Sequence, residues 1–283
     1  MLDLTVIKSF LGNPFYEAEG VLLYNMDCLE AMRRLEGDFV SLTVTSPPYN
    51  IGKEYERLRP LEDYLDWCEA WMLEIHKITI NNGAFWLNLG YLEIPGRANA
   101  VPLPYLLWDR SPFYLVQEVV WNYGAGVHTK RMFSPRNEKF LWYVKSAQNY
   151  TFHLDEVRDK DVKYPNQKKN GKLKCNPLGK NPSDVWQIPK VTSGTNRSSK
   201  ERTAHPAQFP LAVIDRIVKA CSNVHEIVMD PFMGSGTTAL AALQNERRVL
   251  GFEISEYYCA LARQRIEQWL AGRRHAALQP ALF

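Results

Sequence analysis

The sequence predicts an α/β protein with a mostly parallel, doubly wound sheet, and two widely separated segments predict it. The first is an apolar, β-branched run at residues 39–44, typical of a buried parallel strand, which stops at Pro47 and Pro48. The second is a short apolar strand at residues 226–229, followed by a glycine-rich turn and a helix at residues 239–243. Strands that alternate with helices form parallel sheets, with their functional groups at the carboxyl edge.

A stiff segment, Thr-Ser-Pro-Pro-Tyr-Asn at residues 45–50, follows the first of these strands. Each proline fixes its own backbone angle φ and donates no hydrogen bond, so the segment holds Ser46, Tyr49 and nearby carbonyls in place. By itself the pattern fits an ordinary turn after a strand as well as it fits the lip of an active site. The downstream segment favours the active site.

Residues 230–238, with the sequence Asp-Pro-Phe-Met-Gly-Ser-Gly-Thr-Thr, join the downstream strand to its helix. Glycines let a backbone pass close to a ligand, and the amino end of a helix favours anionic or carboxylate groups. A second strand at residues 248–252 ends in Glu253, where a carboxylate can accept hydrogen bonds from ribose hydroxyls. The whole arrangement predicts a nucleoside-binding site rather than a structural glycine turn.

The two motifs together resemble those of the amino-methylating DNA methyltransferases, which use S-adenosylmethionine. Their order, with Ser-Pro-Pro-Tyr first and the glycine-rich loop last, is similar to the β group of that family. The resemblance covers nearly the whole chain and implies a Rossmann-like methyltransferase sheet in circularly permuted order. We therefore expect catalytic roles for Ser46, Pro47, Pro48 and Tyr49, and cofactor contacts for Asp27, His205, Asp230, Pro231, Phe232, Gly234, Ser235, Gly236, Thr237 and Glu253.

Two of these residues have structural explanations that are about equally good. Asp27 lies where a strand is followed by a helix, so it could cap that helix as well as lie near the adenine end of the cofactor, as the resemblance implies. His205 begins a His-Pro to Pro stretch at residues 205–210, which in the family caps the methionine end of the cofactor. A histidine at the entry of a helix, with no ligand, would explain it equally well.

Hydrophobic periodicity and turn residues predict the remaining elements in order. Residues 1–20 are expected to be irregular, and strands are expected at residues 20–25, 84–89 and 114–121 and in the segment that ends at Lys145. Helices are expected at residues 26–35, 61–80, 211–221 and 256–270, with a short helix within residues 90–112 and frayed chain from Gly272.

Two further segments are expected beside the site. Residues 51–60 are charged and contain glycine, so they predict either a loop that could close over substrate or a plain solvated loop. Residues 131–145 resemble a loop and aromatic strand that help to form the base pocket in the family. Within them, Trp142 and Tyr143 are expected in the core rather than against a base.

A change of composition near Ser146 divides the chain into three expected parts. Residues 1–145 form the catalytic part of the methyltransferase domain, residues 146–204 a target-recognition insertion, and residues 205–283 the cofactor-binding part. Two basic stretches of the insertion lack apolar periodicity, and alone they would indicate only a solvated loop. Together with the two motifs they are expected to contact DNA phosphates or bases, through Lys168, Lys169, Lys172, Lys174, Arg197, Lys200 and Arg202.

The predicted chemistry is methyl transfer to an exocyclic amino group of a DNA base. Such an amine is a poor nucleophile because its lone pair is conjugated with the ring. Ser46 and the carbonyl of Pro47 can accept its hydrogens and localise the lone pair, and Tyr49 can stack on a base pulled from the duplex. In the resembled family Ser-Pro-Pro-Tyr is associated mainly with N4 of cytosine, which we expect here, with N6 of adenine as the alternative. Methylation of a ring carbon is disfavoured, because it needs a Pro-Cys thiolate and no cysteine here follows a proline.

Composition limits the other possibilities. The net charge of +3 is only mildly basic, and the five cysteines show no metal-ligand or disulfide spacing, so no metal is expected and a reducing compartment fits. The sequence shows no signal-peptide pattern and no apolar run of membrane-spanning length. We expect the cytoplasm of a prokaryotic or phage-infected cell, double-stranded DNA as partner, and a monomer or homodimer; a cognate restriction endonuclease could accompany the enzyme.

Two rival functions are also compatible with parts of the sequence. Gly234-x-Gly236-x-x-Ala239 with Glu253 loosely satisfies the fingerprint of a dinucleotide-dependent oxidoreductase, but this leaves Ser-Pro-Pro-Tyr and the basic insertion unexplained. A DNA-binding protein without catalytic activity is the other rival. Methyl transfer from labelled cofactor separates it from the predicted enzyme.

Overall fold

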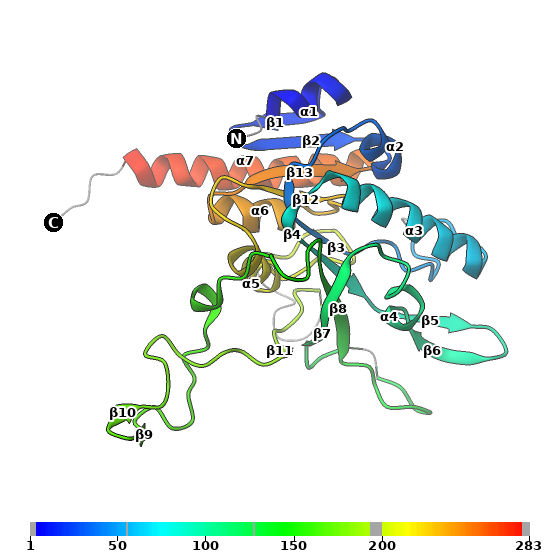
Figure 1. Ribbon diagram of the computed structural model, residues 1–283. Helices are drawn as coiled ribbons and strands as arrows, with labels where there is room; N and C mark the ends of the chain where they lie inside the picture. The colour runs from blue at the N-terminus through cyan, green and yellow to red at the C-terminus, as the bar shows by residue number, and fades with distance from the viewer. Residues whose placement is uncertain (1–3, 55, 127, 193–199, 279–283) are drawn as a thin grey trace.

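A nine-stranded sheet forms the centre of the protein (Figure 1). The computed structural model describes residues 4–54, 56–126, 128–192 and 200–278. The central strands from β2 to β4 are parallel, β1 pairs antiparallel at one edge, and β8 is antiparallel to both of its neighbours. In spatial order the strands are β1 (Tyr16–Ala18), β2 (Val21–Asn25), β13 (Arg248–Glu253), β12 (Ile227–Asp230), β3 (Val40–Thr45), β4 (Thr79–Leu89), β8 (Asn137–Val144), β7 (Tyr114–Asn122) and β11 (Val185–Gln187).

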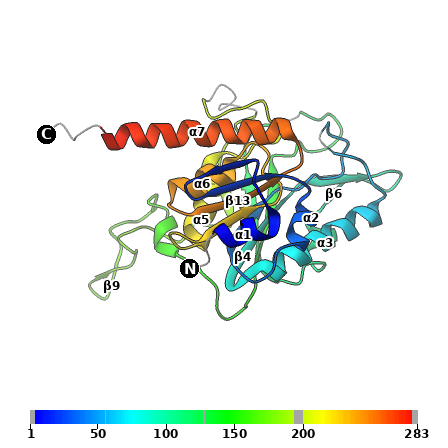
Figure 2. The same ribbon diagram turned by 90° about the horizontal axis from the view of Figure 1, so that it is seen from above.

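Helices cover both faces of this sheet (Figure 2). Successive strand residues point to opposite faces, so in β13 Leu250 and Phe252 pack in one core while Val249 packs in the other. The mostly parallel, doubly wound α/β fold expected from the sequence is therefore confirmed. One face carries α1 (Leu4–Leu11), α2 (Cys28–Arg33), α3 (Leu61–Ile78) and α4 (Pro104–Leu107), and the other α5 (Leu211–Cys221), α6 (Thr237–Gln244) and α7 (Glu256–Leu278).

The two motifs meet because their strands are neighbours in the middle of the sheet. β12 lies beside β3 in parallel, with Val228 opposite Leu42 and Met229 opposite Thr43. The hydroxyl of Thr45, at the end of β3, donates to Asp230 at the end of β12 over 2.7 Å. The strand that carries the glycine-rich loop thus comes late in the chain but lies at the centre of the sheet, as a circularly permuted order requires.

Three local expectations were wrong. Residues 1–20 are not irregular, because α1 buries Ile7 and Leu11 and β1 extends the sheet beyond β2. The segment from residue 90 to 112 contains more than a short helix, since β5 (Tyr91–Ile94) and β6 (Ala98–Pro102) form a hairpin before α4. The last helix also continues through Gly272 to Leu278 instead of fraying there.

The stretch from residue 146 to 204 is divided between the body of the protein and a projecting hairpin. The short 3-10 helix η1 (Leu154–Val157) lies against α5. The hairpin of β9 (Lys168–Lys169) and β10 (Lys172–Leu173) projects away from the sheet (Figures 1 and 2). The chain then returns to the sheet through β11, which pairs with β7 and buries Trp186.

Candidate active site

A pocket of about 670 Å³ lies at the carboxyl edge of the sheet, where β3 and β12 end. It brings together thirteen of the fourteen catalytic and cofactor residues predicted from the sequence. These are Asp27, Ser46, Pro47, Pro48, Tyr49, His205, Asp230, Pro231, Phe232, Gly234, Ser235, Thr237 and Glu253.

Gly236 is the predicted cofactor residue that does not line the pocket. It adopts φ +78°, and a Cβ atom there would lie 3.0 Å from the Cβ of Ala262 on α7. A glycine is therefore needed here for the turn into α6 and for the close approach of α7, because a side chain would strain the backbone and crowd α7.

The catalytic segment is held by hydroxyl groups. The Ser46 and Tyr49 hydroxyls are 2.9 Å apart, and the Tyr49 hydroxyl donates to Oδ1 of Asn88 over 2.7 Å. The Tyr64 hydroxyl donates to the carbonyl of Pro48 over 2.9 Å. Within the described part of the chain, no hydrogen bond engages the carbonyl of Pro47. The segment thus carries a hydroxyl and an unengaged carbonyl on adjacent residues, and both residues line the pocket.

A glycine makes room for the aromatic ring of this segment. A Cβ atom on Gly90 would lie 2.8 Å from Cε2 of Tyr49, which is closer than real Cβ contacts. Gly90 directly follows β4, whose Asn88 accepts the Tyr49 hydrogen bond. Strand β4 therefore fixes both the position and the orientation of the Tyr49 ring.

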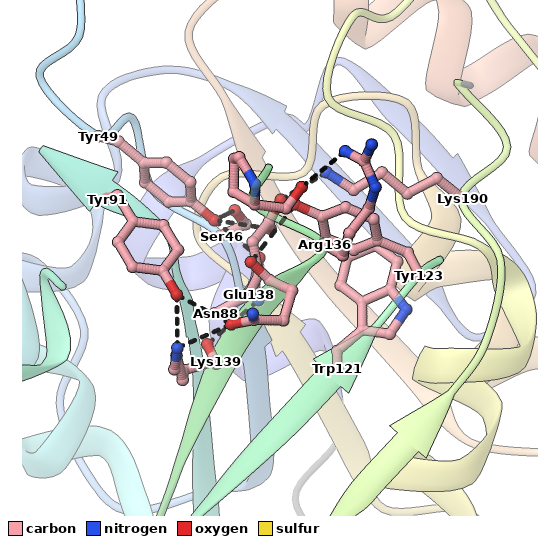
Figure 3. Close-up of polar contacts among 12 residues, drawn as sticks. Ser46, Tyr49, Asn88, Tyr91, Trp121, Tyr123, Arg136, Glu138, Lys139 and Lys190 are labelled. Carbon is pink, nitrogen blue, oxygen red and sulfur yellow. Dashed lines mark hydrogen bonds and ion pairs between the residues drawn. The ribbon is translucent and has the colours of Figure 1, made fainter. Parts of the chain in front are cut away.

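An ion pair lines the pocket next to the catalytic segment (Figure 3). Lys190 Nζ donates to Oε1 of Glu138 over 2.6 Å, and Oε2 of Glu138 lies 3.4 Å from the Tyr49 hydroxyl. The same ammonium group lies 3.8 Å from the centre of the Tyr123 ring. Both side chains of the pair are mostly shielded from solvent, with exposures of 17% and 21%. A charge pair and an aromatic face therefore lie close to the Tyr49 hydroxyl, which contacts Ser46.

Apart from Glu138, which lies in the segment of residues 131–145 expected beside the pocket, sequence reasoning missed these wall residues, because they come from different strands and carry no local motif. Figure 3 shows that they lie around one place, although β4, β5, β7 with the residue that follows it, β8 and the segment after β11 supply them. The pocket residues that were not predicted include Asn88, Gly90, Tyr91, Trp121, Tyr123 and Lys190. Pro135, Asn137 and Glu138 also line the pocket, and they belong to residues 131–145, which were expected beside it. By contrast, Trp142 and Tyr143 lie in the core, as expected.

Asp230 is buried and joins the two motifs. It is 3% exposed and accepts hydrogen bonds from the Thr45 hydroxyl at 2.7 Å, the Thr238 hydroxyl at 2.7 Å and the backbone amide of Phe232 at 3.0 Å. Burial raises the pKa of this carboxyl to about 6, although the three hydrogen bonds oppose the shift. Asp230 therefore holds the cofactor loop to the end of β3 at the cost of burying a carboxylate.

Replacing Asp230 by asparagine should change how stability depends on pH. The folded-state pKa of about 6 exceeds the free value of 3.8, so the stability linked to this proton is fully present below pH 3.8 and is lost as the pH rises through 6. The unfolding free energy of Asp230→Asn minus that of the wild type should therefore increase as the pH rises from 4 to 7, by on the order of 3 kcal/mol. Urea unfolding at several pH values measures this, with Asp38→Asn at an exposed position as control. Parallel pH profiles for wild type and Asp230→Asn would contradict it.

Glu253 closes the other side of the glycine-rich loop. Its two carboxylate oxygens accept from the backbone amides of Gly234, at 2.8 Å, and Ser255, at 2.9 Å. Burial raises the pKa of this carboxyl, and the two amides oppose the rise. Glu253 also lines the pocket, so it is placed to hold the loop and to meet a ligand at the same time.

The glycine-rich loop forms a close cradle under His205 and α7. Gly234 has φ +52°, and a Cβ atom there would lie 2.9 Å from Nε2 of His205. Burial, together with the nearby Arg265, lowers the pKa of His205 to about 4, so its imidazole is neutral near pH 7. Arg265, which was not predicted, donates to the Ser235 carbonyl over 2.6 Å. A cradle with bare backbone, an acidic rim and aromatic Phe232 fits a nucleoside cofactor with a carboxylate.

Asp27 combines both roles considered for it. Its side chain accepts from the amide of Glu30 over 2.9 Å and so caps α2, and it also lines the pocket. The nearby loop is braced by Glu56, whose carboxylate accepts from the backbone amides of Asn50, Ile51 and Lys53. Residue 55 lies outside the described residues.

The predicted DNA-contacting residues do not line the pocket. Lys168, Lys169, Lys172 and Lys174 are exposed on or beside the β9–β10 hairpin. Lys200 and Arg202 are exposed in the segment that leads to His205, and Arg197 lies outside the described residues. Their role in DNA binding stays a prediction.

The described residues contain neither a metal site nor a membrane-spanning helix. No three His, Cys, Asp or Glu side chains of this part of the chain are grouped so that they could hold a metal ion. No helix formed by these residues has both the length and the apolar character that crossing a bilayer requires.

Comparison with known proteins agrees with this geometry. The family model described as DNA methylase, for N6 and N4 methyltransferases, matches residues 40–264. The type II methyltransferase M.ScaI of Streptomyces caespitosus is 62% identical over 261 residues, which cover 92% of this chain and 86% of that protein.

Two solved structures share the fold. The PvuII cytosine-N4-specific DNA methyltransferase superposes with a TM-score of 0.70 at 20% identity, over 93% of this chain and 95% of that chain. TTHA0409 of Thermus thermophilus, in complex with S-adenosylmethionine, has a TM-score of 0.61 at 24% identity, over 88% of this chain and 96% of that chain. The chain therefore belongs to the N4/N6 amino-group DNA methyltransferases, which act on DNA with S-adenosylmethionine as the cofactor.

Proposed function

We propose that the protein methylates the N4 amino group of cytosine at a specific sequence in duplex DNA. The observation that carries this proposal is the pair of acceptors at the end of β3, the Ser46 hydroxyl and the carbonyl of Pro47, beside the Tyr49 ring. A pocket at the end of a sheet can receive a base only after the base leaves the helical stack. The site is therefore built for a flipped base.

The residues of this chain prepare the amine for attack. When bound, S-adenosylmethionine supplies an electrophilic methyl group on a positively charged sulfur. The Ser46 oxygen and the Pro47 carbonyl accept the two amine hydrogens, which localises the nitrogen lone pair outside the ring plane. The nitrogen lone pair forms the new bond to the methyl carbon as the bond from that carbon to sulfur breaks and its electron pair stays on sulfur. The nitrogen then releases one proton, first to a hydrogen-bonded acceptor and then to water. Tyr49 holds the Ser46 hydroxyl at 2.9 Å throughout.

Cofactor binding is assigned to the glycine-rich cradle. Glu253 is proposed to accept from ribose hydroxyls, and Asp27 to lie at the adenine end of the cofactor. Asp230 is buried and holds the loop, so it acts on the cofactor by orienting residues 231–235. His205, neutral at pH 7, is proposed to cover the methionine end.

Cytosine is preferred over adenine because the tetrapeptide begins with Ser46 rather than Asp or Asn. The family includes enzymes for both amino groups, and a hydroxyl can serve either base, so the preference rests on the association of Ser-Pro-Pro-Tyr with N4 of cytosine. Enzymatic digestion and nucleoside analysis of DNA methylated by the protein test the proposal directly. N4-methylcytosine is expected, and N6-methyladenine in its place would show that the target is adenine. Sequencing of the modified sites also gives the recognition sequence.

The β9–β10 hairpin is proposed to contact DNA phosphates. Lys172 and Lys169 face each other across the hairpin, and like charges in that position are destabilising unless an anion lies between them. Every side chain from residue 163 to residue 174 is exposed. The hairpin thus presents concentrated positive charge away from the body of the protein.

Neutralising Lys168, Lys169, Lys172 and Lys174 to glutamine should weaken DNA binding and flatten its dependence on salt. The slope of log affinity against log salt concentration should fall by about 0.9 for each phosphate that the lysines no longer neutralise. Fluorescence anisotropy at several salt concentrations measures this, with Arg33→Gln on the distant helix α2 as control. Cofactor affinity should be unchanged. An unaltered salt slope would show that the hairpin is only a solvated loop.

A further inference from the structure

The loop that joins β7 to β8, residues 123–136, carries an aromatic side chain with no packing partner among the described residues. Phe133 is 101% exposed, more than any other large apolar residue of the described chain, and its neighbour Met132 is 49% exposed. A buried phenylalanine side chain stabilises the folded state by about 2–3 kcal/mol. Phe133 is not buried, so it does not stabilise the fold in this way. Its position is better explained by a contact with another molecule.

The tip of this loop has a defined shape. Ser134 Oγ accepts from the amide of Thr129 over 3.2 Å, and the Thr129 hydroxyl donates to the carbonyl of Met132. At the root of the loop, the amide of Tyr123 donates to the carbonyl of Arg136 over 3.0 Å. Phe133 is thus presented on a braced turn, so little conformational entropy would be lost when it binds.

The same loop borders the catalytic pocket. Pro135, two residues after Phe133, lines the pocket, as do Asn137 and Glu138 at the start of β8. In Figure 1 the loop projects from the lower edge of the sheet, beyond the ends of β7 and β8. A molecule that delivers a base to the pocket would therefore meet Phe133 beside the pocket entrance.

The positive charges around Phe133 indicate that the partner is a nucleic acid. Lys130, Arg131 and Arg136 lie within four residues of it, and no acidic residue occurs between Val119 and Asn137. Cations beside an apolar wedge match the two parts of a DNA duplex, phosphates outside and stacked bases inside.

We propose that Phe133 enters the base stack of duplex DNA and fills the space that the flipped target base vacates. This inference rests on the proposed function, because only an enzyme that extracts a base leaves such a space. Extraction costs the stacking and pairing of that base, and an inserted ring restores part of the stacking. Phe133 thereby stabilises the flipped state.

The test compares Phe133→Ala with wild type on two duplexes that carry the mapped recognition sequence. In one duplex the target base is normally paired, and in the other it faces an abasic residue, which removes its pairing. Phe133→Ala should lower kcat/KM on the paired duplex by about 5- to 150-fold, the range expected when one aromatic–base stack is removed. On the second duplex the loss should be several-fold smaller, since extraction there costs less. Phe133→Trp should keep most activity on both.

Controls separate this role from a structural one. Tyr114→Ala removes another exposed ring, 56% exposed, at the opposite end of β7, and should leave both rates unchanged. All variants should bind S-adenosylmethionine as the wild type does. An equal loss of rate on both duplexes, or no loss on either, would overturn the inference, while formation of N4-methylcytosine by the wild type upholds the proposed function. Wild-type protein that forms no N4-methylcytosine in either duplex would overturn the proposed function itself.

Discussion

Ser46→Ala should nearly abolish methyl transfer and leave S-adenosylmethionine binding intact. The substitution removes the hydroxyl oxygen that is expected to accept an amine hydrogen, and it leaves the carbonyl of Pro47 as the remaining acceptor. Groups that exchange or orient protons in a transition state contribute about 10²–10⁴-fold to rate, so we expect kcat to fall by about a hundredfold or more. Single-turnover transfer of a labelled methyl group measures the effect without interference from product release.

A comparison with Tyr49→Phe distinguishes the serine oxygen from its support. That variant keeps the ring for stacking and loses the hydroxyl that lies 2.9 Å from Ser46 and donates to Asn88. We expect a smaller loss of kcat than for Ser46→Ala, because the acceptor is still present but less well oriented. Ser9→Ala on the exposed face of α1 is the matched control for the chemical change. Full activity of a folded Ser46→Ala protein would show that Ser46 has no catalytic role.

Glu253→Ala should weaken S-adenosylmethionine binding by about 1.5–3 kcal/mol, the range for the removal of hydrogen bonds to a charged group. This corresponds to a loss of affinity of roughly 10- to 150-fold. Isothermal titration or quenching of tryptophan fluorescence by the cofactor measures it. Unchanged affinity in a folded variant would show that Glu253 does not contact the ligand.

Part of that loss could come from the loop, because Glu253 also accepts from the amides of Gly234 and Ser255. A deoxyribose analogue of the cofactor separates the two contributions. If Glu253 binds the ribose, the wild type should lose affinity for the analogue, and Glu253→Ala should bind analogue and cofactor equally. Glu253→Gln keeps an oxygen for one of the amides, so it should preserve the loop better than the alanine variant.

The sequence predicted best those parts of the site that are continuous in the chain. Residues 46–49 follow β3 directly, and residues 230–237 begin with the last residue of β12, so strand ends and turn chemistry were enough to place them at one edge. Membership of the methyltransferase family also removes the dinucleotide-dependent oxidoreductase considered as a rival.

The rest of the site depends on the register between strands, which no local pattern specifies. Asn88 lies opposite Phe140, and Glu138 opposite Trp121, only because β4, β8 and β7 pair as they do. Lys190 reaches Glu138 after β11 has joined the sheet, and the polar composition of its surroundings gave no sign of that strand. Helix α1 was not predicted because it has eight residues and buries two of them, Ile7 and Leu11, which is a weak periodic pattern.

The position of β12 and β13 has a consequence for the order in which the chain acquires structure. Both strands lie between β2 and β3 in the sheet, but they are synthesised about two hundred residues after them. While the chain grows on the ribosome, β2 and β3 each keep an unpaired edge, and their pairing must wait for contacts of very long sequence separation. Such contacts slow folding and leave strand edges of the nascent chain open to wrong associations. The loop after β12 can take its place against Ser46 and Tyr49 only after this late strand has inserted beside β3, so the two halves of the site form together.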